Sequence, residues 1–263
     1  MPMKNILRSL LGGLFAAAFV VVAQAADLVP GAFSAGTVEG DVTYKLAGSS
    51  QYLPLTAGTA LPQGATIKTG PDSTASIVFS NGAVATITAE SEVEITKFEQ
   101  EVFSGPLPTG AEPSISNTEI NVANGTVVSK VAKLKTGSSY IVKSPVGAAG
   151  VRGTTFSVTF NKVTREYTVK TLTGLVVWQS APGAAQTAAS VDVPTGTAYS
   201  GGPAVRQLEP AEIVVIEAAI AKAIIAINNA PSANPAPGTP GSETPARGPV
   251  INADGSITIS VNT

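Results

Sequence analysis

The chain has 263 residues and a net charge of −2, and it contains neither cysteine nor histidine. These absences exclude disulfides, thiolate or imidazole metal sites and the common nucleophilic triads. The slightly acidic balance is unlike the basic footprint of a nucleic-acid-binding protein. We therefore expect no enzymatic activity, no cofactor, no metal and no nucleic-acid partner.

The first residues have the pattern of a bacterial signal peptide. Lys4 and Arg8 give a positively charged start, residues 10–22 form an apolar run, and Ala23-Gln24-Ala25 supplies a small-residue cleavage site. The run is shorter than the ~20 residues of a membrane span, so an uncleaved anchor is the less favoured alternative. We predict a signal peptide over residues 1–25 and export to the periplasm or the cell exterior. The lack of cysteine excludes a lipoprotein anchor.

Residues 35–200 are predicted to form a β domain, because strand patterns alternate with turns about every eight to twelve residues. Alternation over residues 75–79 and the following Asn81-Gly82 predict a strand and a tight turn. Asn124-Gly125 predicts a second hairpin, within residues 119–132. Further strands are expected over residues 84–88, 93–95, 140–143, 151–160, 167–172 and 175–179, with a loop or break over residues 99–116.

The composition changes after the β domain. Residues 209–229 predict a helix with one isoleucine stripe: Ile213, Ile216, Ile220, Ile224 and Ile227. We favour packing of this stripe on the β domain, while contact with a second copy or a partner helix stays open. Residues 230–249 contain six prolines and predict a flexible linker. Residues 250–263 predict a terminal strand or hairpin that covers an edge of the chain's own sheet or pairs with a neighbour, and we favour the first.

Four short motifs within residues 61–200 occur in an order that resembles the FecR domain of bacterial envelope proteins. The first is Lys68-Thr69-Gly70 ahead of a strand, and the second is the turn at Gly82. The third is Pro145 followed by Arg152-Gly153-Thr154 and Phe156, and the fourth is the strand–glycine–strand pattern around Gly174. We expect a structural role for the motif residues Thr69, Gly70, Gly82, Pro145, Arg152, Gly153, Thr154, Phe156 and Gly174.

The resemblance implies a mainly β fold, a FecR-like and jelly-roll-like β-sandwich, to which one C-terminal helix and a terminal strand are added. It also implies a binding or relay module rather than a catalyst. FecR regulators begin with a cytoplasmic segment that binds a sigma factor, followed by a membrane span. A signal peptide takes that place here, so the resemblance gives no reason to expect direct control of a sigma factor.

Two charge patterns have both a structural and a functional interpretation. Glu90, Glu92 and Glu94 alternate along a predicted strand, where carboxylates can bind Ca²⁺ or act on a glycosidic bond; we favour a solvated strand face. Residues 90–119 contain seven glutamates and one lysine, whereas residues 130–170 contain eight basic residues and one glutamate. We favour neutralisation between adjacent strands, and a docking surface for an envelope partner or an anionic glycan stays open.

The sequence as a whole predicts an exported, non-enzymatic protein whose FecR-like domain binds a protein or a glycan. The alternative is a structural protein that assembles by pairing its C-terminal strand with a neighbour. Self-association is expected through residues 213–227 or residues 250–263 if it occurs. A glycosidase with an acid pair is a distant third possibility.

Overall fold

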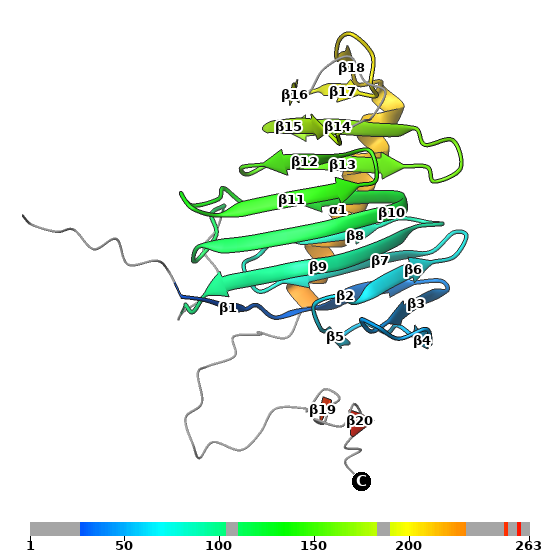
Figure 1. Cartoon of the computed structure of the whole chain (residues 1–263), viewed down its shortest axis with the longest axis vertical. Coiled ribbons are helices and arrows are strands. Elements are labelled where there is room, and N and C mark those ends of the chain that lie inside the picture. Colours follow the sequence, from blue (N-terminus) through cyan, green and yellow to red (C-terminus); the bar gives the residue numbers. More distant parts are fainter. Residues whose placement is uncertain (1–26, 104–109, 183–189, 230–249, 252–256, 259–263) are drawn as a thin grey trace, which may run out of the picture.

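A computed structural model describes residues 27–103, 110–182, 190–229, 250–251 and 257–258. The predicted signal peptide and the predicted linker lie outside the described residues. Strands stacked in two layers make up most of the described chain, and one long helix lies against them (Figure 1). The predicted mainly β fold with one C-terminal helix is confirmed.

The strands form two sheets that share one long strand, β10 (Ser116–Lys130). The first sheet contains β1 (Leu28–Pro30), β3 (Val42–Lys45), β4 (Leu53–Pro54), β6 (Thr66–Thr69), β9 (Glu92–Glu101), β11 (Ser139–Ser144), β12 (Gly147–Val151), β15 (Leu175–Ser180) and β16 (Ser190–Pro194). The second contains β2 (Phe33–Glu39), β5 (Ala60–Leu61), β7 (Thr74–Phe79), β8 (Val84–Ile87), β13 (Thr155–Phe160), β14 (Tyr167–Thr173), β17 (Thr197–Tyr199) and β18 (Arg206–Gln207).

Apart from β4 and β5, which lie at the ends of the two sheets, the order of the strands in each sheet follows their order in the chain. The first sheet runs β4-β3-β6-β9-β10-β11-β12-β15-β16, with β1 beside the end of β9, and the second runs β5-β2-β7-β8-β10-β13-β14-β17-β18. Neighbouring strands are antiparallel, whereas β10 and β11 are parallel. As the chain proceeds, strands are therefore added to both sheets in the same direction, from the bottom to the top of Figure 1.

The hairpin predicted around Asn124-Gly125 is wrong, because β10 continues through both residues. Its first half pairs with β9 and β11 in one sheet, and its second half pairs with β8 and β13 in the other. Gly125 has φ of +87°, and a Cβ on it would lie 2.1 Å from Oγ of Ser91. A left-handed glycine is typical of a hairpin turn. At Gly125 it instead bends one continuous strand, so that the strand passes from the first sheet into the second.

The single strand predicted over residues 151–160 is also wrong. Arg152-Gly153-Thr154 separates β12 from β13, and these two strands belong to different sheets. Gly153 has φ of +85°, which allows the chain to turn from one layer to the other. Val151 and Phe156, on the two sides of this corner, are both buried, so the hydrophobic pattern continues across it.

The core lies between the two sheets and is rich in aromatic rings. Phe33, Phe79 and Phe98 form one cluster, with ring centres 5.0 to 6.2 Å apart. Tyr167 stacks on Trp178 at 4.5 Å in a second cluster. The inward positions alternate with outward ones along each strand, so each sheet contributes one face to the core.

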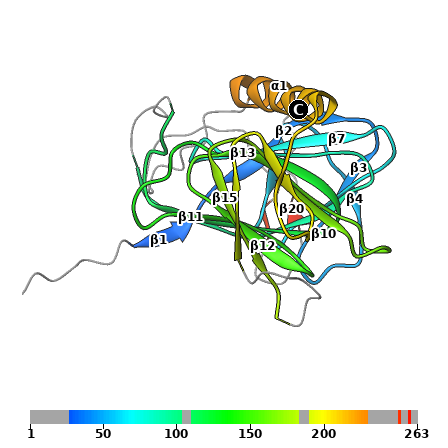
Figure 2. The same ribbon diagram turned by 90° about the horizontal axis from the view of Figure 1, so that it is seen from above.

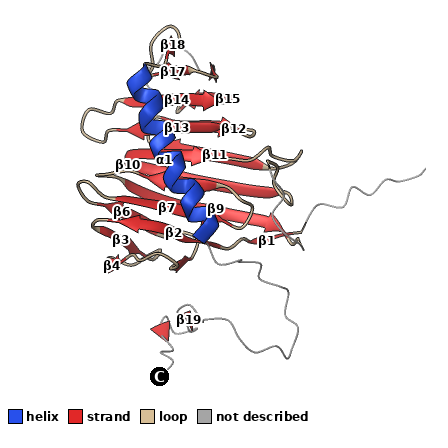
Figure 3. Cartoon of the chain, turned by 180° about the vertical axis from the view of Figure 1, so that it is seen from behind, coloured by secondary structure: helices blue, strands red, loops and turns tan. Residues whose placement is uncertain are grey.

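The helix α1 (Pro210–Asn229) crosses the outer face of the second sheet (Figures 2 and 3). Ile216, Ala219, Ala223 and Ala226 are its buried residues, and they pack on Val78, Val84 and Val128. The predicted packing of the helix on the β domain is confirmed for this face, whereas Ile224 of the predicted stripe is 43% exposed. In the part of the chain that the structure describes, α1 does not meet the length and apolarity that crossing a membrane requires.

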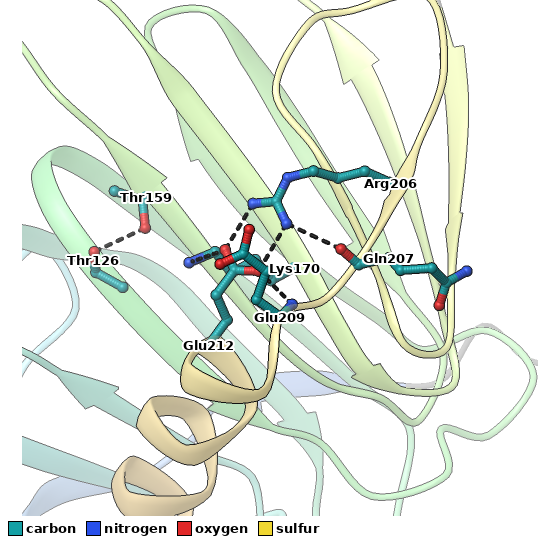
Figure 4. A network of polar contacts seen from close by, with 7 residues as sticks. All are labelled: Thr126, Thr159, Lys170, Arg206, Gln207, Glu209 and Glu212. Atoms are coloured by element: carbon teal, nitrogen blue, oxygen red, sulfur yellow. Dashed lines mark hydrogen bonds and ion pairs between the residues drawn. The ribbon is translucent and has the colours of Figure 1, made fainter.

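Glu212 anchors the first turn of α1 to the second sheet (Figure 4). Both terminal nitrogens of Arg206 donate 2.7 Å hydrogen bonds to its carboxylate, and Nζ of Lys170 lies 3.1 Å away. The amide of Glu209 donates a 2.9 Å bond to the same carboxylate, which satisfies a free N–H at the helix start. The hydrogen bonds from Arg206 hold the pKa of Glu212 well below its ordinary value.

The last two strands, β19 (Val250–Ile251) and β20 (Ile257–Thr258), pair with each other in an antiparallel hairpin. Within the described residues these strands pair with neither of the two large sheets. The favoured prediction, that the tail covers an edge of the chain's own sheet, therefore has no support here.

Candidate ligand-binding groove

Several motif residues lie at corners where the chain passes between the sheets. A Cβ on Gly153 would lie 2.8 Å from the Cα of Lys133, and a Cβ on Gly174 would lie 2.8 Å from the carbonyl oxygen of Gly153. Oγ1 of Thr154 donates a 3.1 Å hydrogen bond to the carbonyl of Leu175. The β12–β13 and β14–β15 corners therefore lie in direct contact, and no larger residue fits between their backbones.

Thr69 and Gly70 lie at another corner, between β6 and β7. The hydroxyl of Thr69 donates a 2.6 Å bond to the carbonyl of Thr88 and accepts a 3.0 Å bond from the amide of Ser91. The amide of Gly70 donates a 2.8 Å bond to the carbonyl of Asp41. The motif thus joins the β2–β3, β6–β7 and β8–β9 connections into one rigid surface.

Two adjoining hollows next to this corner form a candidate binding site. Their volumes are about 300 and 260 Å³, and Lys68, Thr69 and Gly70 line both. The first is also lined by Asp41, Thr43 and Tyr52, and the second by Pro71, Glu90, Ser91, Glu92, Asn124 and Lys162. We call the surface that these residues form the corner groove.

Tyr52 supplies the aromatic ring of the corner groove. The Nζ atoms of Lys45 and Lys68 lie 5.3 and 5.8 Å from the ring centre, within the range of cation–π attraction. The hydroxyl of Tyr52 donates a long hydrogen bond of 3.5 Å to Glu92. These three partners belong to the adjacent strands β3, β6 and β9, so the half-buried ring lies across the surface of the first sheet.

Asn124 holds the second part of the corner groove in place. Its Nδ2 donates a 2.8 Å bond to the carbonyl of Glu90, and its Oδ1 accepts a 3.1 Å bond from the amide of Lys162. Glu90 precedes β9 with φ of +53°, so the predicted row of three glutamates on one strand is reduced to Glu92 and Glu94. Among the described residues, no three acidic side chains are placed to hold a metal ion.

The corner groove presents both signs of charge around one ring. Its carboxylates belong to Asp41, Glu90 and Glu92, and its ammonium groups to Lys68 and Lys162. A ligand needs both donors and acceptors to satisfy this set, and hydroxyl groups provide both. The groove therefore suits a polar, polyhydroxylated ligand better than an apolar one.

The other predicted residues lie outside the groove lining. Gly82 has φ of +86° in the β7–β8 turn, and Phe156 is fully buried against Tyr140. Pro145 and Arg152 are exposed at the two ends of β12. Of the residues for which a structural role was expected, Thr69 and Gly70 line the groove, next to Lys68 of the same motif.

Among the described residues, oppositely charged side chains of the acidic and basic runs come together at Glu119 and in the corner groove. Nζ of Lys143 on β11 lies 2.5 Å from Oε2 of Glu119 on β10, which is neutralisation between adjacent strands. Lys162 and the pair Glu90 and Glu92 come together in the corner groove.

Sequence reasoning did not find Tyr52, Asp41 or Lys162 as site residues. Each is a single polar residue in a connection or near a strand end, and nothing in its local sequence separates it from other exposed residues. The proximity of Asp41 and Tyr52 depends on the pairing of β3, β6 and β9, and that of Lys162 on the pairing of β10 and β13, neither of which the sequence pattern alone specifies.

Comparison with known proteins finds a family match within the β domain. The family model described as FecR protein matches residues 65–177. Two crystal structures of a candidate anti-sigma factor from Parabacteroides distasonis ATCC 8503 share 12% identity with this chain at a TM-score of 0.39. The alignment covers 57% of this chain and 62% of that one, a similarity too low to carry a functional argument. No curated protein matches the sequence.

Proposed function

Because residues 65–177 form a FecR domain, we propose that the protein is a non-enzymatic binding module of the bacterial envelope that recognises a glycan in the corner groove. The observation that carries this proposal is the groove itself, in which one aromatic ring lies among acidic and basic side chains. Its location in the envelope rests on the signal-peptide pattern of residues 1–25.

The composition of the corner groove favours a glycan over a protein. The centre of a protein–protein interface is depleted in charged side chains and enriched in apolar and aromatic ones. The groove instead contains five charged side chains, with Tyr52 and Pro71 as its main apolar surfaces. Amide, hydroxyl and carboxylate groups of a bacterial cell-wall glycan match this mixture of donors and acceptors.

The groove also suits binding because its shape is fixed before a ligand arrives. Hydrogen bonds of Thr69, Gly70 and Asn124 hold the backbone of its connections. A preformed site loses less conformational entropy on binding than a mobile one. A shallow site of this kind implies weak recognition of one short stretch of a polymer, strengthened by repeated units along the glycan.

Soluble peptidoglycan fragments are the probe that tests this proposal, by isothermal titration calorimetry with the purified protein. Tyr52→Ala removes the ring and should weaken binding by about tenfold or more, as for a central aromatic contact. Lys68→Ala should weaken binding less, and its effect should decrease at high salt.

Lys143→Ala is the matched control, because Lys143 is exposed on the first sheet outside the groove. It should bind like the wild type. Equal binding by all four proteins would place recognition outside the corner groove. The wild type could instead fail to bind the fragments but retain an envelope protein that Tyr52→Ala does not retain. In that case the ligand of the groove would be a protein and not a glycan.

A further inference from the structure

The helix α1 has a second apolar face, opposite the one that packs on the sheet. The inner face approaches β2 closely, since a Cβ on Gly36 would lie 2.6 Å from the Cβ of Ala226. The outer face leaves large apolar side chains in solvent: Val214 is 62% exposed, Val215 63%, Ile224 43% and Ile225 53%. Such a concentration of exposed branched residues on one helix is typical of an interaction surface.

The spacing of the outer face is that of a coiled-coil seam. The exposed residues Ala211, Val214, Ala218, Ala221 and Ile225 recur at alternating intervals of three and four, which are the a and d positions of a heptad. Val215 and Ile224 border the seam at e and g positions and widen it. The alanines near its middle allow a second helix to approach closely.

We propose that this seam pairs with the same seam of a second copy, with the two helices parallel. In a parallel pair, a g residue of one helix faces the e residue five positions later on the other. Glu217 is the g residue and Lys222 is the e residue five positions later. An antiparallel pair would place neither residue opposite its countercharge.

Within one chain, neither Glu217 nor Lys222 is fully engaged, so both can form an ion pair with a second copy. Within the described residues Glu217 is exposed and takes part in no ion pair. Nζ of Lys222 contacts Glu39 at 2.5 Å and Thr74 at 3.2 Å. An ammonium group has three N–H donors, so one remains for Glu217 of a second copy. A two-fold axis along the seam then produces this ion pair twice.

Sedimentation velocity over a range of protein concentrations tests the proposal. The protein is purified from the cell as it occurs there, so that any N-terminal processing is retained. The wild type should dimerise, and Val214→Glu with Ile225→Glu should be monomeric with an unchanged circular dichroism spectrum, because both positions are exposed. Val163→Glu places the same charge on a residue that is 83% exposed in the β13–β14 hairpin, and it should still dimerise. A monomeric wild type, or dimers that survive the double substitution, would overturn the proposal.

A charge-swap experiment tests the parallel register. Glu217→Lys and Lys222→Glu should each weaken the dimer of that variant, because like charges then face each other. An equimolar mixture of the two variants should regain the dimer, since both cross-pairs are attractive. If the mixture stays as weak as its components, the register is wrong. If deletion of residues 250–263 abolishes the dimer, strand pairing by the tail replaces the helix seam.

Discussion

Gly125, Gly153 and Gly174 have φ between +85° and +87°, and each marks a point where the chain passes from one sheet to the other. Asp72 and Glu90 adopt the same left-handed conformation, with φ of +53°, near two further passages. A side chain at φ > 0 costs about 1–2 kcal/mol, which glycine avoids. These three glycines are therefore required by the path of the backbone rather than by a binding site.

Gly153→Ala should lower the free energy of unfolding by about 2 kcal/mol or more, because the left-handed strain adds to a clash with the backbone of Lys133. Gly150→Ala is the matched control three residues earlier, where a Cβ would lie 3.9 Å from the nearest atom. It should leave stability nearly unchanged. Urea unfolding midpoints measure both, and equal midpoints would contradict the close approach at this corner.

Local sequence patterns predict the burial of some residues but not of others. Phe156 was predictable as part of a motif and of an alternating strand, and it is fully buried. Glu112 was not, since it lies in a stretch that predicts a loop. Its buried carboxylate accepts bonds from Ser116 Oγ at 2.8 Å and the amide of Lys135 at 2.5 Å, and also from Ser138. Such a network depends on long-range contacts that no local pattern encodes.

At the scale of elements, the helix was predicted over residues 209–229 and spans Pro210–Asn229. Its buried face was harder to predict, because both faces are apolar. The isoleucine stripe suggested one face, but the alanines at 219, 223 and 226 lie against the sheet, where the close approach at Gly36 leaves little room. The short distance between the helix and the sheet determines which face of the helix is buried. A hydrophobic pattern does not show this distance.

The anchor at Glu212 makes the docking of α1 dependent on pH. Its pKa in the folded protein is lowered, mainly by hydrogen bonds from Arg206, so its stabilisation is complete above the unfolded pKa of about 4.3. That stabilisation is lost as the pH falls below this value. Glu212→Gln should cost about 2 kcal/mol at pH 7, and the difference from the wild type should shrink towards pH 2.

Thermal unfolding followed by circular dichroism between pH 2 and pH 7 measures this difference. Asp192→Asn removes an exposed carboxylate on β16 and should behave like the wild type throughout. A constant gap between Glu212→Gln and the wild type at every pH would show that the substitution acts through packing and not through charge.

At the scale of the whole molecule, the sequence predicted two layers of strands but not their connections. Both turn-like dipeptides, Asn81-Gly82 and Asn124-Gly125, have the same local signal, yet one closes a hairpin and the other bends a continuous strand. The corner groove depends on this difference. It gathers residues from six separate segments of the chain between Asp41 and Lys162, so only the assembled sheets create it.

The glycan-binding corner groove is the central claim, and a heteronuclear NMR titration of the protein with soluble peptidoglycan fragments tests it most directly. We predict that the amide signals of residues 68–70 and 90–92, which line the groove, shift progressively with fragment concentration. Signals from the outer strand β16 (Ser190–Pro194) should stay in place. An unchanged spectrum, or shifts confined to residues outside the groove, would contradict the claim.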